Sequence, residues 1–426
     1  MKNYNDYLID LAKLISIKSE KSAPQPNKPF GDGVANALDC FLNIAKKMGF
    51  ETFNYENYIG EVRYGKGEEI GIIGHVDVVP EGIGWNYPAY QLTINDDKLY
   101  GRGVADDKGP LLTCLYALKE LKDSNVKTNK QFRMFIGCDE ESGWADVKYF
   151  KEKHSFPEYG FSPDGNFPVS YAEKGMVEIL FKLPKLKKFK AIKGGTVVNA
   201  VCAYACCEAL EGGIDSELLK KHNLVLKDGN IIESYGRSAH GSQPQLGENA
   251  LINLFKYFLD MGEDVEKVLN YILLDQLNIS KLKTEQGYVT LSAGLINQTE
   301  EEVVITCDCR IPAPLTLADV EEKIKLFNIP FSTKTRHEPM VVEKQGWFVN
   351  TLSNAYATIT GESLNPISQG GSTFARAFRK GCAFGPEFPG CCSHIHEPND
   401  FVAKEQVLKS FEIYKKAIFD LAQYKN

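Results

Sequence analysis

The sequence lacks an excess of basic residues. Its 426 residues include 49 Lys and Arg against 56 Asp and Glu, which gives a net charge of −7. Nucleic acids and anionic membrane surfaces are bound through basic patches, so this balance argues against either as the main partner. We therefore expect no nucleic-acid partner and no membrane partner.

Long apolar runs are also missing. No stretch approaches the roughly 20 apolar residues that a bilayer-spanning helix needs, and residues 1–17 do not resemble a signal peptide. Tyr7, Leu11 and Leu14 recur there at helical spacing, which predicts an amphipathic helix. Together these features predict a cytoplasmic protein.

Two motifs that would point to other classes of protein are absent. The 11 cysteines are odd in number and follow no secretory signal, so we expect reduced, mostly buried thiols. None of the close cysteine pairs has the C-x-x-C repeat of a zinc ribbon: Cys206–Cys207, Cys307–Cys309 and Cys391–Cys392. No G-x-G-x-x-G stands between a strand and a helix, which argues against a Rossmann oxidoreductase.

Short apolar runs and a helical pattern alternate in the first part of the chain. Residues 71–79 and 131–137 are apolar runs stopped by proline or by acids, which predicts buried strands. Between them, leucines at helical spacing and a proline in the first turn predict a helix over residues 110–123. The order strand–helix–strand predicts an α/β domain with a mixed, largely parallel sheet flanked by helices.

The pattern changes after about Gly175 and returns to the α/β type near Gly346. We expect strands at 176–183 and within 288–310, and helices at 200–211, 249–259, 317–326, 349–360 and 403–424. We predict a catalytic metal-binding domain of residues 1–174 and 341–426. An α+β domain of residues 175–340 is inserted into it.

Imidazoles and carboxylates recur where apolar runs give way to Gly, Pro or Asp. They are His75, Asp77, Asp106, Glu140, Glu141, Asp164 and His396. Ligands at strand ends, gathered from distant parts of one sheet, are how a two-metal hydrolytic site is built. Carboxylates mixed with imidazoles suit Zn²⁺, Mn²⁺ or Co²⁺.

Each of these segments also has an ordinary explanation when taken alone. Asp106 or Asp107 can cap the helix that follows, residues 139–141 can be a solvated acidic loop, and residues 163–165 are an ordinary turn. Residues 394–400 fit a surface loop equally well. The hypothesis of a metal site rests on the combination.

The combination resembles the ArgE/DapE-type dinuclear metallopeptidases, and within them the PepV-type dipeptidases. The matching motifs run in family order between residues 74 and 400: GHVDVVP, GRGVADDKGP, GCDEESG, SPDG, GRSAHGSQPQLGENA, SQGGSTFAR and HIHEPND. The resemblance implies that His75 and Asp164 bind one metal ion and that Glu141 and His396 bind the other. Asp106 would bridge the two, with a cis peptide bond after it.

The resemblance also implies roles for residues that bind no metal. Asp77 would support His75, Glu140 would be the general base, and His394 matches no family ligand. The inserted domain would be the lid, from which His240 reaches the substrate carbonyl. The substrate-binding residues would be Asn199, Arg310, Gly370, Gly371 and Ser372, with Arg310 holding the substrate carboxylate; a strand-end salt bridge is the other explanation for that arginine.

We therefore predict a metal-dependent dipeptidase with two divalent ions, zinc first, with manganese or cobalt as alternatives. The near alternative is an N-acyl-amino-acid deacylase or a succinyl-diaminopimelate-desuccinylase-like amidohydrolase. A non-catalytic binding protein is disfavoured because Glu140 and all five expected ligands are present. The long lid favours a monomer, and a homodimer stays open; the acid that would bind a substrate amine is not identified.

Overall fold

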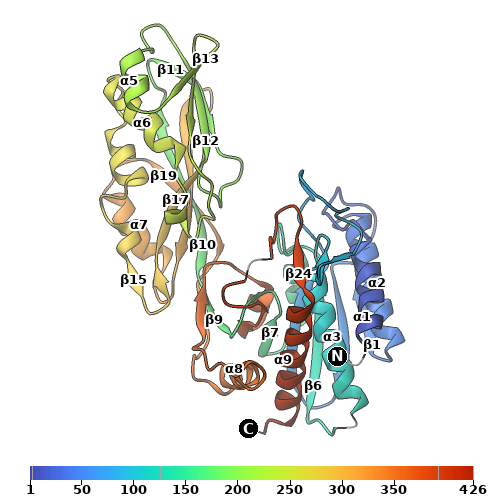
Figure 1. The fold of residues 1–426 in the computed structure, drawn as a ribbon. Helices are drawn as coiled ribbons and strands as arrows, with labels where there is room; N and C mark the ends of the chain where they lie inside the picture. Colours follow the sequence, from blue (N-terminus) through green and yellow to red (C-terminus); the bar gives the residue numbers. More distant parts are fainter. Residues whose placement is uncertain (2, 125, 392, 426) are drawn as a thin grey trace. The chain divides into compact units, whose positions relative to one another are not determined.

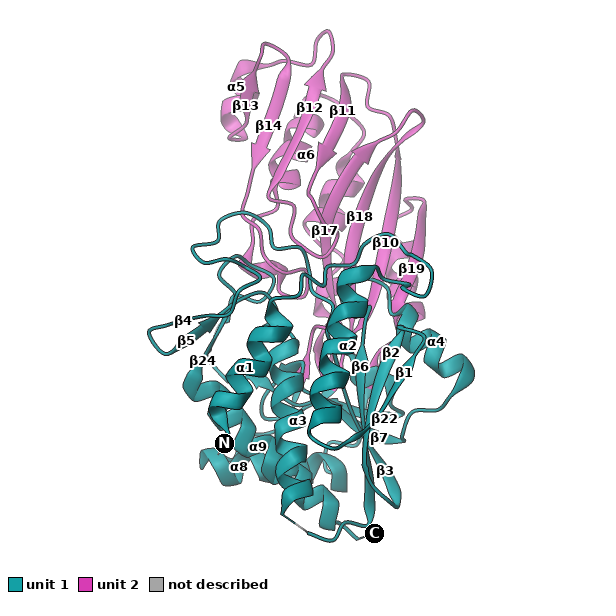
Figure 2. Cartoon of the chain, turned by 90° about the vertical axis from the view of Figure 1, so that its right-hand side faces the viewer, with its two compact units in different colours: residues 1–171, 341–367, 373–426 teal, residues 172–340, 368–372 magenta. Residues whose placement is uncertain are grey.

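The computed structural model describes residues 1, 3–124, 126–391 and 393–425. The chain forms two compact units, shown in different colours in Figure 2. Unit 1 comprises Met1–Tyr171, Val341–Ile367 and Thr373–Asn426, and unit 2 comprises Ala172–Met340 and Ser368–Ser372.

Unit 1 is built on a 9-stranded sheet with the order β1-β2-β6-β3-β7-β22-β9-β20, in which β21 also pairs with β9. The strands are β1 (Glu51–Tyr55), β2 (Ile59–Gly65), β3 (Glu68–His75), β6 (Lys130–Gly137), β7 (Tyr159–Ser162), β9 (Ser170–Glu173), β20 (Met340–Val341), β21 (Ile367–Gln369) and β22 (Lys380–Ala383). The neighbours β6, β3, β7 and β22 run parallel, while β1, β2 and β9 join them antiparallel. The predicted mixed α/β fold class is confirmed.

Helices pack against this sheet, and several of them are labelled in Figure 1. They are α1 (Tyr4–Ile15), α2 (Asp32–Lys47), α3 (Lys108–Asp123), α4 (Ala145–Lys153), η4 (Phe374–Ala377), α8 (Trp347–Thr360) and α9 (Lys404–Gln423). Strand β3 shows how close the layers lie. A Cβ on Gly74 would stand 1.9 Å from Asp107 Oδ2 beside α3, and one on Gly71 would stand 2.1 Å from the Phe378 ring that follows η4.

Two small sheets bring distant loops of unit 1 together. Strand β24 (Phe401–Ala403) pairs with β5 (Lys98–Tyr100), which pairs with β4 (Thr93–Asn95). Strand β23 (Pro386–Glu387) pairs with β8 (Gly165–Asn166). The first pairing places residues 393–400 beside residues 101–107, because these segments adjoin β24 and β5.

Unit 2 is built on an 8-stranded sheet with the order β13-β14-β12-β11-β17-β18-β10-β19. The strands are β10 (Gly175–Pro184), β11 (Phe189–Gly194), β12 (Tyr204–Ala209), β13 (Val225–Lys227), β14 (Ile231–Tyr235), β17 (Thr290–Gln298), β18 (Glu302–Ile311) and β19 (Phe331–His337). All neighbouring pairs are antiparallel. Its apolar core joins these strands to α6 (Ala250–Asp260), η2 (Val268–Leu273) and α7 (Leu317–Lys325), and α5 (Ser216–Lys221) lies beside α6.

The helix predicted over residues 200–211 is wrong. The segment forms strand β12 between β11 and β14, with Ala205, Cys206 and Cys207 buried. Its small and apolar side chains suit either state, and strand pairing on both sides decides in favour of β structure.

Most of the described cysteines are buried thiols, among them Cys114, Cys138, Cys307 and Cys309. Burial raises the pKa of each of these four thiols. Cys392 of the Cys391–Cys392 doublet lies outside the described residues. Among the helices of the described residues, none combines the length and the hydropathy that crossing a bilayer requires.

Candidate active site

The expected ligands of unit 1 follow the ends of three neighbouring parallel strands. His75 ends β3, Glu141 follows β6, and Asp164 follows β7. Because parallel strands end at the same edge of a sheet, these side chains meet there. Asp106 and His396 come from the loops that the pairing of β24 with β5 holds together.

Asp106 stands between the two imidazoles. Its Oδ1 lies 2.9 Å from His75 Nε2, and its Oδ2 lies 2.9 Å from His396 Nε2. Each carboxylate oxygen therefore faces a different ring, which is the arrangement a carboxylate needs to bridge two metal ions. The Asp106–Asp107 peptide bond is cis.

Three further acids lie beside these imidazoles, and the whole group is a candidate metal centre. Glu141 Oε2 lies 3.2 Å from His396 Nε2, and Asp164 Oδ2 lies 3.8 Å from His75 Nε2. Potential ligand atoms of His75, Glu140 and Asp164 lie within 4.8 Å of one another, as do those of His75, Asp106 and Glu141. The two groups overlap at His75, and Asp106 belongs to the second.

The electrostatics of the centre show a shortage of positive charge. Burial and the negative charge of Asp106 raise the pKa of Asp164 to about 8, and burial and Asp164 raise the pKa of Glu140 well above its usual range. Burial would lower the pKa of His396, but its hydrogen bonds to Asp106 and Glu141 raise it to about 11. A divalent cation would supply the charge that these groups otherwise obtain by holding protons. The donor set therefore fits metal ions.

His75 is fixed through its second ring nitrogen. Nδ1 lies 3.0 Å from the backbone carbonyl oxygen of Asp77 and 3.4 Å from its Oδ1. A bond from Nδ1 to the carbonyl leaves Nε2 to face Asp106, as a metal-ligating imidazole requires. The Asp77 carboxylate also accepts a hydrogen bond of 3.1 Å from the backbone N–H of Glu141. Asp77 thereby ties the two strand ends together.

Two acids hold the turn that carries Glu140 and Glu141: Asp146, which was not predicted from the sequence, and Asp139, for which a solvated acidic loop was the ordinary explanation. Asp146 accepts from the backbone N–H groups of Cys138 and Asp139, at 2.7 and 3.1 Å. Asp139 accepts from Lys21 Nζ at 2.6 Å and from the backbone N–H of Ala145 at 3.0 Å. The Asp139 contact is the ordinary one of an acid with a free N–H group at the start of a helix, here α4. The Asp146 contacts reach back to residues outside the helix.

A buried ion pair joins the loops that carry Asp106 and His396. Asp400 Oδ2 accepts from Arg102 Nη1 at 3.4 Å and from the backbone N–H of Gly103 at 3.1 Å. Arg102 Nη2 also donates to the carbonyl of Pro80 at 3.3 Å. His394, which matched no expected ligand, lies with its Nδ1 3.7 Å from Glu397 Oε2.

Unit 2 holds a second group of candidate site residues, made of polar side chains and the glycines beside them. We call it the unit 2 polar cluster: Asn199, His240, Gly241, Ser242, Asp308, Arg310, Gly370, Gly371 and Ser372. Arg310 Nε lies 2.8 and 3.0 Å from the two carboxylate oxygens of Asp308, and its Nη1 donates to the Gly370 carbonyl at 2.9 Å. Arg310 was expected either to hold the substrate carboxylate or to form a strand-end salt bridge, and these contacts are compatible with both. The salt bridge to Asp308 is present, and the guanidinium has further N–H groups that these bonds do not use.

The His240 loop is tied into the same cluster. His240 Nδ1 accepts from the backbone N–H of Ser242 at 3.2 Å and lies 2.7 Å from Ser242 Oγ. An acceptor role for Nδ1 places the ring proton on Nε2, so the neutral imidazole is a donor there. The backbone N–H of Gly241 donates to the Asn199 carbonyl at 2.7 Å.

The 370–372 segment completes the unit 2 polar cluster. A Cβ on Gly370 would stand 2.7 Å from Ser242 Cβ, whereas one on Gly371 would meet open space. Ser372 Oγ is buried and makes no hydrogen bond within the described part of the chain.

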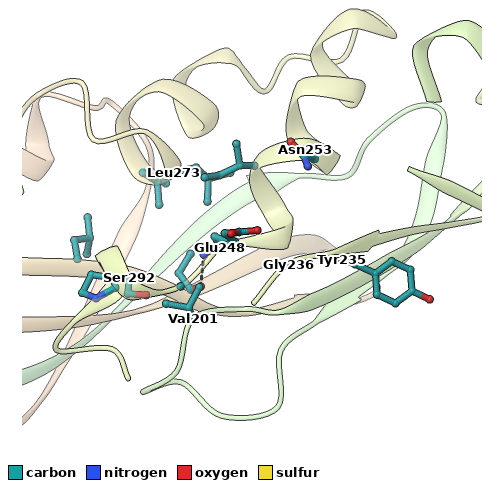
Figure 3. A pocket seen from close by; sticks show the side chains of 14 residues that line it. Val201, Tyr235, Gly236, Glu248, Asn253, Leu273 and Ser292 are labelled. Carbon is teal, nitrogen blue, oxygen red and sulfur yellow. Dashed lines mark hydrogen bonds between the residues drawn. The ribbon is translucent and has the colours of Figure 1, made fainter. Parts of the chain in front are cut away.

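A separate pocket of about 390 Å³ also lies in unit 2, lined by residues that include Val201, Tyr235, Asn253, Leu273 and Ser292 (Figure 3). Asn249 Nδ2 closes part of its wall by donating to the Ala293 carbonyl at 2.8 Å. Among the described lining residues are none of the predicted site residues.

Comparison with known proteins agrees with this chemistry. The sequence profile described as "Peptidase family M20/M25/M40" matches residues 71–420. A Bacillus subtilis protein named "Putative dipeptidase YtjP" is 31% identical over an alignment 461 positions long, which covers 99% of this chain and 98% of the relative.

Solved structures share the fold at low sequence identity. Human carnosine dipeptidase 1 superposes with a TM-score of 0.62 at 14% identity, covering 99% of this chain and 96% of that one. The di-peptidase Dug1p from Saccharomyces cerevisiae gives a TM-score of 0.60 at 14% identity, covering 99% and 97%.

Proposed function

The chain belongs to peptidase family M20/M25/M40, and from that premise we propose that it hydrolyses the amide bond of dipeptides with two divalent metal ions. The observation that carries the proposal is the placement of Asp106, whose two oxygens each lie 2.9 Å from a different imidazole. His75 and Asp164 would hold one ion, and Glu141 and His396 the other.

Two divalent ions held by these residues would polarise the amide carbonyl and would make bound water acidic enough to act at neutral pH. Glu140 takes the proton from the attacking water and returns it to the leaving amine. Its place beside His75 and Asp164 supports this role. Asp77 keeps the His75 ring oriented while the reaction proceeds.

The unit 2 polar cluster supplies groups for the substrate. We assign the Nε2–H of His240 to the carbonyl oxygen as negative charge develops on it, which stabilises the transition state rather than the bound substrate. Arg310 is assigned to the substrate carboxylate, with Asn199, Gly370, Gly371 and Ser372 as further substrate contacts. In this proposal residues 175–340 act as the lid of a catalytic domain of residues 1–174 and 341–426.

Zinc is the first choice of metal, because imidazoles and carboxylates suit it, and manganese and cobalt are the alternatives. The monomeric state and the cytoplasmic location stay predictions from the sequence.

A substrate panel on metal-stripped protein tests the proposal. Zinc, manganese and cobalt are restored in turn, and hydrolysis of free dipeptides is compared with hydrolysis of N-acetyl and N-succinyl amino acids. We expect cleavage of free dipeptides, restored best by zinc. Preferential cleavage of the acylated amino acids would assign the chain to the deacylases instead.

A further inference from the structure

Asp308 and Arg310 lie on the face of the unit 2 sheet that is turned away from its apolar core. They stand two residues apart on β18, so their side chains share a face. The intervening Cys309 and the preceding Cys307 belong to the core. Asp308 is 3% exposed and Arg310 is 1% exposed.

Asp308 contacts Arg310 at the Nε atom of its guanidinium. Both of its oxygens face Nε, at 2.8 and 3.0 Å, and the Gly370 carbonyl takes one N–H of Nη1 at 2.9 Å. Nη2 donates to no atom of the residues that the structure describes. A guanidinium has N–H groups in a planar fork, so the Nη edge stays able to bind a carboxylate in the two-point manner that arginine favours.

The acid opposite Asp308 on the neighbouring strand has a partner of its own. Glu178 lies opposite Asp308 on β10, and it forms its own ion pair with Arg336. Asp308 is therefore the carboxylate that neutralises Arg310. Removing one partner of a buried pair leaves the other charge uncompensated, so the pair is expected to act as a unit.

Asp308 also lies against the loop that carries His240. A Cβ on Gly241 would stand 2.3 Å from Asp308 Oδ2, so the loop passes the carboxylate at a distance that only glycine allows. The same carboxylate thus contacts both Arg310 and the backbone of the His240 loop at Gly241.

We propose that Asp308 is a positioning residue that aims the Nη edge of Arg310 at the substrate carboxylate and thereby sets the preference for substrates with a free carboxyl end. This inference rests on the role proposed above for Arg310. Asp308 itself does not touch the substrate; it acts through the arginine that it holds by Nε.

Asp308→Asn in the metal-loaded full-length enzyme tests this, with one dipeptide and the C-terminal amide of the same dipeptide as substrates. Charge-assisted hydrogen bonds contribute about 1.5–3 kcal/mol, so we expect KM for the free dipeptide to rise roughly 10- to 100-fold. For the amide, kcat/KM should change less than about 3-fold, because the amide offers Arg310 no carboxylate. Glu302→Gln is the matched control, since Glu302 lies on the same strand and pairs with the exposed Lys182.

A double-mutant cycle shows whether Asp308 acts through Arg310. In an Arg310→Ala background, Asp308→Asn should leave the ratio of acid to amide turnover unchanged. Two results would overturn the proposal. One is a loss of activity in Asp308→Asn that is equal for the acid and the amide substrate. The other is a change in the ratio of acid to amide turnover when Asp308→Asn is added to Arg310→Ala. If Asp308→Asn does not fold, Asp308→Glu keeps the charge and displaces the arginine, and unchanged selectivity in that variant overturns it equally.

Failure of the proposed dipeptidase activity can be told apart from failure of the role proposed for Asp308. An enzyme that cleaves N-acetyl amino acids instead still meets a free carboxylate, so the comparison of acid with amide can be made on that substrate pair.

Discussion

The metal centre of unit 1 and the unit 2 polar cluster both contain buried charges, Asp106 in the first and Asp308 with Arg310 in the second, but they differ in how their charges balance. In the metal centre, Asp106, Glu140, Glu141 and Asp164 face two imidazoles, and burial among like charges raises the pKa of Glu140, Glu141 and Asp164. In unit 2, Asp308 and Arg310 form a matched pair. The first arrangement needs a cation, and the second is neutral by itself.

The two regions also differ in what positions them. The metal centre takes its ligands from the ends of parallel strands, where several chain segments converge on one sheet edge. The unit 2 polar cluster depends on close approach of loops, as at Gly241, where a Cβ would stand 2.3 Å from Asp308. Substitutions should therefore act through metal binding in unit 1 and through substrate selectivity or turnover in unit 2.

Removing the bridging carboxylate should give the largest effect. In Asp106→Asn the charge of the carboxylate that we propose bridges the two ions is lost, so we expect metal content to fall toward zero and kcat/KM to fall by more than about 10⁴-fold. Metal analysis of the purified protein and turnover of a dipeptide measure this. Asp123→Asn, an exposed acid at the end of α3 paired with Lys119, is the control that should keep both.

Glu140→Gln should separate catalysis from metal binding. The amide keeps the size of the side chain but cannot take a proton, so kcat should fall about 10²- to 10⁴-fold while metal content stays that of the wild type. Glu152→Gln on α4 is the exposed control. Wild-type turnover in Glu140→Gln would contradict the role of general base.

Much of the metal centre could be predicted from the sequence because its residues mark strand ends. His75 lies within one apolar run and Glu141 follows another, and these runs, stopped by proline or by acids, predict buried strands. The supporting residues were harder to find. Asp146 and Asp400 act through backbone N–H groups contributed by other segments, at 138–139 and 103, and no local pattern records such contacts.

Unit 2 was less predictable for a physical reason. Residues 200–211 carry small apolar side chains that suit a helix or a strand, and the pairing of β12 with β11 and β14 decides the outcome. Asp308 was overlooked although it stands two residues before Arg310. Its importance arises from the approach of Gly241 and Gly370, which lie far away in the sequence.

A substitution in the unit 2 polar cluster should leave metal content unchanged, unlike one in the metal centre. His240→Ala removes a donor to the developing negative charge, so kcat should fall roughly 10²- to 10³-fold with a smaller change in KM. Ser242→Ala should cost less, because the backbone N–H of Ser242 still donates to His240 Nδ1. Dipeptide turnover and metal analysis decide this, and a loss of metal in His240→Ala would count against a substrate contact.

The smallest effect is on stability, and it should appear only when metal is removed. Burial and Asp106 raise the pKa of Asp164 from 3.8 to about 8, and the pKa of His396 is raised from 6.5 to about 11. In both cases the folded state binds more protons than the unfolded state, so stability is lost as pH rises through these ranges. We expect the Tm of metal-free protein to be a few °C lower at pH 8 than at pH 5.5, and zinc to restore more stability at pH 8 because deprotonated ligands bind it better. Differential scanning calorimetry with and without chelator measures this. A metal-free protein that is equally stable or more stable at pH 8 would show that the metal centre is not short of positive charge, and the contrast with the paired Asp308 and Arg310 would then fail.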